Sequence, residues 1–290
     1  MAESPDGGGS LYLLEQRFRY RYDTPVVRLR HRLVVVPPAA HGGQYRLDHG
    51  LTVSGALVSV SESLDSFGNH VTELGAATVS EWIEFEAWAL VGCRGAGGVA
   101  TVAPESAGDD RLLAPTPLTE TDGRLADAAG ELSATASGAM DLAERACAWT
   151  HRSMTYQHGI TGVHTTAAEA LAGGQGVCQD YAHVMLALCR QAGLPARYVS
   201  GHLLGEGGSH AWVEVVVDDP LRTSSGRMVA VAFDPTHDRR AGQGYFTVAV
   251  GRDYADVAPT SGTFEGTGPG LLSAAKRLGL ADADRRTAAS

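Results

Sequence analysis

The 290-residue sequence has few cysteines and no long apolar run. Its four cysteines (Cys93, Cys147, Cys178 and Cys189) form no C-x-x-C pair, which argues against a disulfide framework or a zinc knuckle. Scattered cysteines suit a reducing compartment, so we expect a cytoplasmic protein. The first ten residues lack the basic and apolar segments of a secretory signal, and no apolar stretch reaches the roughly 18 residues of a membrane span.

Positive charge is also scarce. The chain has 23 basic and 33 acidic residues, which give a formal net charge of −10. Nucleic-acid backbones and anionic membranes prefer basic surfaces, so we expect neither as a partner. The 11 histidines show no H-x-x-x-H or H-E-x-x-H spacing, and no D-x-D-x-D-G calcium loop is present. We therefore expect no metal and no cofactor.

Residues 11–91 show the two-residue alternation of half-buried strands. The turn-forming residues of Asp65–Asn69 predict a hairpin between two of these strands. We expect an N-terminal antiparallel domain that resembles a β-sandwich and carries no catalytic spacing. The predicted strands are Leu11–Tyr22, Val27–Val36, Leu51–Val60 and Val79–Val91.

The rest of the chain divides into a linker, a core and a tail. Residues 92–123 are rich in Gly, Ala, Pro and Asp without periodicity, which predicts a surface linker. Residues 124–262 form the expected catalytic core, with helices at Ser137–Ser153 and near Thr166–Ala172. In the tail, residues 263–290, we expect one short helix around Leu271–Leu280 and disorder at the last residues.

Cys178 is the candidate nucleophile. It follows the Gly-rich segment 173–176 and opens an apolar helical stripe that should end at Gly193. In the first turn of a helix, free N–H groups and the helix dipole favour a thiolate and make the sulfur nucleophilic. Cys189 lies eleven residues further along the same stripe, and Cys147 lies on the apolar stripe of another helix. We expect both to be inert core residues.

A hairpin supplies the candidate partners of Cys178. If the loop Asp218–Gly226 sets Val217 opposite Arg227, then His210 falls opposite Asp234, and a slip of two residues would leave them diagonal neighbours. A histidine held by a carboxylate has a fixed tautomer and can act as a base. The pattern thus predicts a nucleophile, a base and an orienting group. The strands expected here are Ala196–Leu204, His210–Val217 and Met228–Asp234.

The residues around these three positions closely resemble the bacterial transglutaminase-like family over roughly residues 140–255. The first half of the chain resembles the β-rich N-terminal region that accompanies this core in bacteria. The resemblance implies an α+β fold in which a papain-like core packs the cysteine helix on an antiparallel sheet, and it assigns the catalytic roles to Cys178, His210 and Asp234. The sequence departs from many relatives at Thr236-His237-Asp238, where they carry Asn residues. The matching motifs are Gly176-Val177-Cys178-Gln179-Asp180-Tyr181-Ala182-His183, Ser209-His210-Ala211-Trp212-Val213-Glu214-Val215 and Phe233-Asp234-Pro235-Thr236, with flanks Leu194–Gly201 and Val248–Tyr254.

These residues predict acyl transfer on the amide bond of a peptide or protein through a thioester. Water as acceptor gives a peptidase or amidase, which we favour slightly, and a lysine-like amine gives a cross-linking transglutaminase. A non-catalytic binding module that keeps the fold is the third alternative.

A tetrahedral intermediate needs N–H or O–H donors. The Cys178 backbone N–H is one, and the second candidate donor is Tyr156, Gln175 or Gln179. His183 lies roughly 140° around the helix from Cys178, which favours a structural role. His202 and Glu214 are expected on strand faces near the cleft.

Overall fold

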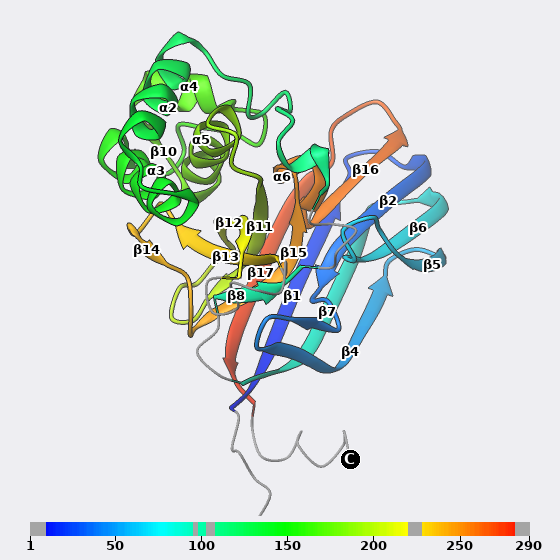
Figure 1. Cartoon of the computed structure of the whole chain (residues 1–290). Helices are drawn as coiled ribbons and strands as arrows, with labels where there is room; N and C mark the ends of the chain where they lie inside the picture. The colour runs from blue at the N-terminus through cyan, green and yellow to red at the C-terminus, as the bar shows by residue number, and fades with distance from the viewer. Residues whose placement is uncertain (1–9, 95–97, 103–107, 220–227, 282–290) are drawn as a thin grey trace, which may run out of the picture.

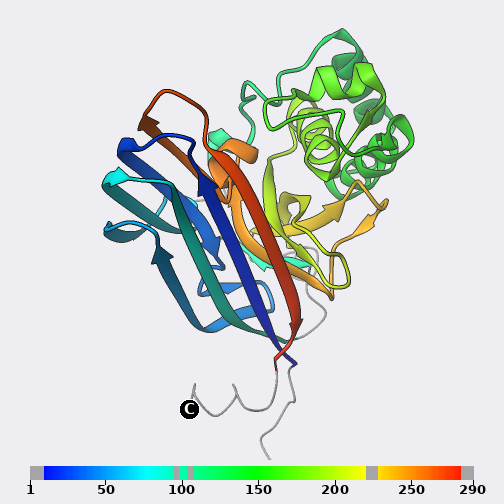
Figure 2. The same ribbon diagram turned by 180° about the vertical axis from the view of Figure 1, so that it is seen from behind.

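The computed structural model describes residues 10–94, 98–102, 108–219 and 228–281. These residues form two lobes, one built of strands alone and one in which helices cover a sheet (Figure 1). The view from behind shows the long strands β1 and β17 side by side along the boundary between the lobes (Figure 2). The fold is therefore α+β, as the sequence predicts.

Two antiparallel sheets make up the β lobe, with strand orders β17-β1-β7-β4-β3 and β16-β2-β6-β5. Side chains from both sheets, including Phe18, Leu33, Ile83 and Phe85, are almost completely buried between them. Burial of each such side chain contributes about 1.5–3 kcal/mol. The predicted β-sandwich is confirmed. Its strands are β1 (Leu11–Arg21), β2 (Val26–Val36), β3 (Ala40–His41), β4 (Gln44–Ser54), β5 (Ser59–Leu64), β6 (His70–Val79), β7 (Trp82–Cys93), β16 (Thr260–Glu265) and β17 (Leu271–Leu280).

The predicted strand Leu51–Val60 is wrong, because the chain turns inside it. Strand β4 ends at Ser54, and Gly55 adopts a φ of +92° before β5 begins at Ser59. A Cβ on Gly55 would lie 2.4 Å from the Trp82 carbonyl oxygen, so this turn requires glycine. The hairpin predicted at Asp65–Asn69 is confirmed between β5 and β6.

The predicted helix around Leu271–Leu280 is also wrong. This segment is strand β17, which pairs along nearly the whole of β1, with Lys276 opposite Gln16. Its Ala-rich composition suits a helix, but β1 offers an open edge whose backbone groups need partners. The segment after Pro259 thus completes both sheets of the β lobe. The disorder predicted for the last residues falls outside the described part of the chain.

In the second lobe, helices pack on an antiparallel sheet with the strand order β14-β13-β12-β11-β15. The short strand β8 also pairs with β13. Helix α5 lies at the centre, and its residues from Asp180 to Arg190 are buried. The helices are α2 (Gly123–Thr135), α3 (Ala139–Ser153), α4 (Ala167–Gly173), α5 (Cys178–Gln191) and α6 (Tyr254–Val257), with a 3-10 turn η1 (Asp110–Leu112). The strands are β8 (Val99–Thr101), β9 (Thr155–Tyr156), β10 (Gln175–Gly176), β11 (Ala196–Leu203), β12 (His210–Asp218), β13 (Met228–Asp234), β14 (Arg239–Arg240) and β15 (Tyr245–Gly251).

The segment predicted as a surface linker contributes to this lobe. Strand β8 extends the sheet, with Ala100 opposite Ala230. Leu112 and Leu118 are buried, and the buried Arg190 of α5 donates to the Leu112 carbonyl (3.3 Å) and to Thr119 Oγ1 (2.8 Å). The described part of residues 92–123 is therefore anchored to this lobe by strand β8 and these buried residues, although many of its other residues are exposed, as expected for a segment at the surface.

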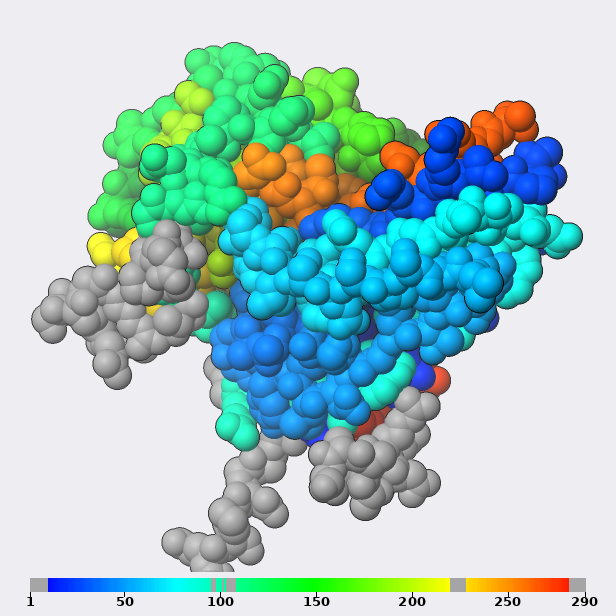
Figure 3. Space-filling model, turned by 90° about the vertical axis from the view of Figure 1, so that its right-hand side faces the viewer, coloured from blue at the N-terminus to red at the C-terminus, as the bar shows by residue number. Residues whose placement is uncertain are grey.

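The two lobes are joined by buried polar contacts. The Asn69 side chain both donates to the Val250 carbonyl (2.7 Å) and accepts from its N–H (2.8 Å), which ties the hairpin after β5 to β15. The Val34 N–H donates to the Pro259 carbonyl. In the space-filling view, the orange segment that contains α6 lies between the green helical lobe and the blue and cyan strands (Figure 3). Among the described residues, the helices are too short or too polar to cross a membrane.

Candidate active site

Cys178 is the first residue of α5, as predicted, and its side chain is half-buried. Val177 precedes it in an extended conformation, and the Asp180 carboxylate accepts a hydrogen bond from the Val177 N–H at 2.7 Å. Thr161 donates a second hydrogen bond to the same carboxylate oxygen. Asp180 thus fixes the start of the helix, and with it the position of the thiol.

The glycine before this turn is required by packing. A Cβ on Gly176 would lie 2.7 Å from both the Cβ and the Oδ2 atom of Asp180. Gly176 also belongs to β10, which pairs with β9 and so holds Tyr156 beside the start of α5.

His210 and Asp234 are in contact, although the predicted register is wrong by two residues. Val217 lies opposite Val229, not Arg227, so His210 and Asp234 are diagonal neighbours. The Nε2 atom of His210 lies 2.8 Å from Asp234 Oδ2, and both side chains are buried. A side-chain hydrogen bond also links His210 to Cys178. The structure therefore brings the three predicted residues together.

Asp234 accepts four hydrogen bonds. Its Oδ2 atom contacts His210, His237 Nδ1 at 2.6 Å and the Tyr245 hydroxyl at 2.6 Å. Its Oδ1 atom accepts from the Thr236 N–H at 2.9 Å. A carboxylate with this many donors stays ionised and is held in a single orientation.

Glu206, in the loop before β12, faces the same two histidines. Its oxygens lie 3.7 Å from His210 Nδ1 and 3.4 Å from His237 Nε2. Each imidazole therefore lies between Asp234 on one side and Glu206 on the other. Sequence reasoning did not identify Glu206, His237 or Tyr245 as members of the site, because each reaches it from a loop or strand end outside the motifs. The one sequence signal for His237 is that Thr236-His237-Asp238 differs from the Asn residues that many relatives carry there.

The charges of the site favour an imidazolium. Burial alone would lower the pKa of His210, but its hydrogen bonds to Asp234 and Cys178 outweigh that effect and raise the pKa to about 10. Burial would raise the pKa of Asp234, but the hydrogen bond and charge of His210 hold it well below its ordinary value. Near neutral pH, His210 is therefore cationic and Asp234 anionic.

Tyr156 stands out among the three candidate second donors. Burial raises the pKa of its phenol to about 12 and so keeps it protonated, and the phenol oxygen accepts a hydrogen bond from the Cys178 backbone N–H. The Gln179 amide donates instead to the carbonyls of Gly162 and Val163, and Gln175 is exposed in β10.

The remaining candidates have structural positions. His183 is fully buried, accepts a hydrogen bond from the Tyr254 N–H, and has a pKa lowered by burial to about 3. His202 is buried with Nδ1 3.1 Å from the Gly208 carbonyl oxygen. Burial raises the pKa of the Cys147 and Cys189 thiols to about 12, which suits inert core residues.

Lys276 of β17 is a cation that sequence reasoning also missed. Burial lowers the pKa of its amine to about 8, opposed by the charge of Cys178. Its Nζ atom lies 5.4 Å from the centre of the Phe18 ring. The C-terminal strand thus brings a positive group within electrostatic range of the thiol.

A cavity of about 820 Å³ lies between the lobes, lined by side chains that include His41, Trp212, Glu214 and Tyr245. Glu214 is buried there and bonded to Arg197 and to His41 Nε2 (2.7 Å). Burial would raise its pKa, but these partners lower it to about 2. Because Tyr245 also donates to Asp234, it connects the cavity to the candidate site.

Two groups of side chains in the described residues could hold a metal ion, His210 with Asp234 and His237, and His49 with Glu62 and His70. The first group is already engaged in hydrogen bonds with its neighbours in the site.

Comparison with known proteins gives matches over both lobes. Residues 126–223 match the family described as "Transglutaminase-like superfamily", and residues 12–91 match the "Bacterial transglutaminase-like N-terminal region". "Uncharacterized protein ML0607" of Mycobacterium leprae is 32% identical over 228 residues, which cover 75% of this chain and 69% of the relative. "Uncharacterized protein Rv2569c" of Mycobacterium tuberculosis is 38% identical over 133 residues, 42% of this chain and 40% of the relative.

A solved structure described as a "Putative Cysteine Protease from Cytophaga hutchinsonii" superposes with a TM-score of 0.76. The alignment covers 96% of this chain and 93% of that chain at 22% sequence identity. At this identity the likeness establishes the fold alone, and it confirms the predicted α+β architecture of a β region with a papain-like core.

Proposed function

This chain belongs to the bacterial transglutaminase-like family, and from that premise we propose that it transfers the acyl group of an amide through a thioester on Cys178. His210 is the general acid and base, and Asp234 orients it. The observation that carries the proposal is that His210 is hydrogen-bonded to Asp234 on one side and to Cys178 on the other. Nucleophile, base and orienting group are the set that this chemistry requires.

In the first half of the reaction, the Cys178 thiolate attacks the amide carbonyl carbon. The oxygen becomes an anion, and we propose that it replaces the Tyr156 oxygen as the acceptor of the Cys178 N–H and also accepts from the Tyr156 hydroxyl. The C–N bond then breaks, and the amine leaves with the proton of the His210 imidazolium. Asp234 holds the ring so that Nδ1 faces the sulfur, because Nε2 is engaged with its carboxylate. The product of this half is a thioester and a neutral imidazole.

In the second half, neutral His210 takes a proton from the acceptor as the acceptor attacks the thioester carbonyl carbon. The C–S bond then breaks, which releases the acyl product and restores the Cys178 thiolate and the His210 imidazolium. We propose water as the acceptor, which gives a peptidase or amidase acting on a peptide or protein. The feature that supports water is the open rim of the site, where the Tyr156 residue and the Glu206 side chain are both 43% exposed. A lysine-like amine in place of water would make the enzyme a cross-linking transglutaminase.

Thiol labelling tests the nucleophile. We expect an alkylating probe at neutral pH to modify Cys178 stoichiometrically, and His210→Ala to abolish the rapid phase. Cys189 and Cys147 are internal controls, because both are buried in the same lobe. Labelling of Cys178 no faster than that of Cys189 would rule out an activated thiol and favour a non-catalytic binding module.

Mass spectrometry of the products tests the acceptor. Candidate peptides are incubated with the protein in the presence and absence of a primary amine, with Cys178→Ala as the blank. A hydrolysed product in both conditions supports the proposal. A product that carries the added amine would instead assign a transglutaminase.

A further inference from the structure

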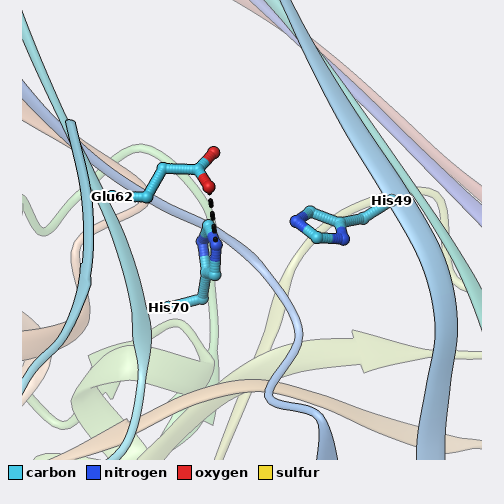
Figure 4. Close-up of side chains that lie close together, drawn as sticks. All are labelled: His49, Glu62 and His70. Atoms are coloured by element: carbon cyan, nitrogen blue, oxygen red, sulfur yellow. Dashed lines mark ion pairs between the residues drawn. The ribbon is translucent and has the colours of Figure 1, made fainter. Parts of the chain in front are cut away.

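Three side chains outside the candidate active site converge at one edge of the β-sandwich. They are His49 of β4, Glu62 of β5 and His70 of β6, and the His49 ring lies across from the paired Glu62 and His70 (Figure 4). We propose that they bind a divalent transition-metal ion of the zinc class and that this ion fastens the two sheets together.

The distances suit such an ion after small side-chain rotations. His70 Nε2 lies 3.6 Å from Glu62 Oε2, and the two imidazole ring centres are 5.1 Å apart at an angle of 76°. One ligand atom from each of the three residues lies within 4.8 Å of the others. Tetrahedral zinc with bonds of about 2.1 Å holds its ligand atoms about 3.4 Å apart. The three atoms therefore have to close by little more than one ångström.

The protonation states are also suitable. A metal ligand has to be a neutral imidazole or an ionised carboxylate. Burial lowers the pKa of both His49 and His70, which favours the neutral form that a metal ion can bind. The charges of Glu62 and Arg46 act on both rings. Asp48 also acts on His49, and His49 acts on His70.

The His70 side chain is mostly buried, with 10% of its surface exposed, and its Nε2 atom is the nitrogen that faces Glu62. An ion held by the three side chains would therefore bind Nε2, while Nδ1, which has no hydrogen-bond partner among the described residues, would keep its present surroundings. Two imidazoles and one carboxylate are a ligand set of zinc and of other first-row divalent ions.

The position of the cluster indicates what the ion would do. His49 belongs to one sheet, and Glu62 and His70 belong to the other. His70 also follows Asn69, whose side chain makes both hydrogen bonds to Val250 in the second lobe. An ion here would link the sheets and stiffen the neighbouring contact between the lobes, so the expected role is structural.

The experiment titrates the full chain with Zn²⁺ alone, by calorimetry and by thermal unfolding. We expect saturable binding and a rise in Tm with Zn²⁺ concentration. Glu62→Gln, His49→Ala and His70→Asn should each weaken the affinity at least about tenfold, since even outer-shell changes cost that much. Glu62→Gln is the decisive variant, because its side chain is 51% exposed and its loss should leave the fold intact.

Two controls separate this cluster from other ligands. His164→Ala removes an exposed histidine and should leave Zn²⁺ affinity unchanged. His237→Ala removes a member of the second possible metal-binding group, which surrounds Asp234, and should leave Zn²⁺ binding by His49, Glu62 and His70 unchanged. The proposal is overturned if Glu62→Gln and His49→Ala bind Zn²⁺ as tightly as the wild type, or if His237→Ala alone abolishes binding. Neither result depends on whether the thiol of Cys178 is reactive.

Discussion

His210 and His237 lie side by side, with ring centres 5.3 Å apart and one nitrogen of each within hydrogen-bond distance of the same Asp234 oxygen. Two imidazoles therefore share this one carboxylate oxygen as their hydrogen-bond acceptor. Asp234 and Cys178 together raise the pKa of His210 against the effect of burial, and the second ring limits how much of that rise Asp234 can supply.

Replacing His237 should strengthen the pair that remains. We expect His237→Asn to keep kcat/KM within about threefold at pH 7 and to move the alkaline limb of its pH profile up by about half a unit. The limb should move to higher pH because, without the His237 hydrogen bond, Asp234 stabilises the protonated form of His210 more strongly. The measurement is the pH dependence of kcat/KM and of Cys178 alkylation. A limb that stays in place or moves down would contradict this coupling.

The proposed oxyanion donor can be separated from the nucleophile. Removing one such donor costs about 10²–10³ in kcat in other enzymes, so Tyr156→Phe should lower kcat by about that factor with little change in KM. Alkylation of Cys178 passes through no oxyanion, so its rate should be nearly unchanged. Gln179→Ala serves as the matched control, because this side chain points to the Gly162 and Val163 carbonyls. Equal losses in alkylation and turnover would show that Tyr156 acts on the thiol instead.

Gly176 offers a test of how the thiol is positioned. In Gly176→Ala the new Cβ meets Asp180 at 2.7 Å, so the carboxylate has to leave the Val177 N–H and the start of α5 shifts. A displacement of about 1 Å at a reacting group can cost about 10²-fold in rate, and we expect a loss of that size in kcat. Gly173→Ala is the control three residues earlier, where a Cβ has open space. Full activity in Gly176→Ala would mean that Asp180 does not position Cys178.

Local sequence patterns predict the elements of the site well. The apolar stripe that begins at Cys178 and ends near Gly193 gives helix α5 almost to the residue. The contact between His210 and Asp234 follows from strand pairing, and it tolerates the two-residue register error because diagonal neighbours on one sheet remain within reach.

Contacts between distant segments could not be predicted in this way. Strand β17 has a helix-like composition and becomes a strand only because the edge of β1 is open, and this pairing brings Lys276 toward Cys178. Tyr245 and Glu206 reach His210 and Asp234 through loop and strand geometry that no spacing encodes. The same holds for His49, Glu62 and His70, which come from three strands of two sheets and form no short motif.

Buried neutral histidines should make the protein sensitive to acid. Burial lowers the pKa of His31 and His202 to about 4 and that of His183 to about 3. In the unfolded chain each has a pKa near 6.5, so between about pH 6.5 and pH 4 the unfolded state binds more protons than the folded state. Stability is therefore fully present above pH 6.5 and is lost as the pH falls through this window. Each group contributes up to about 1.4 kcal/mol of lost unfolding free energy per pH unit.

His31 allows this effect to be isolated. Its ring is buried beside Tyr20 and Phe85, with centres 4.9 and 4.8 Å away, and among the described residues neither of its nitrogens has a hydrogen-bond partner. His31→Phe keeps an aromatic ring in this place and removes the proton-binding site, so the difference in Tm between pH 7 and pH 5 should shrink. His158→Phe, at an exposed position, should leave that difference unchanged. An equal loss of Tm on acidification in His31→Phe and wild type would mean that His31 does not couple folding to protonation.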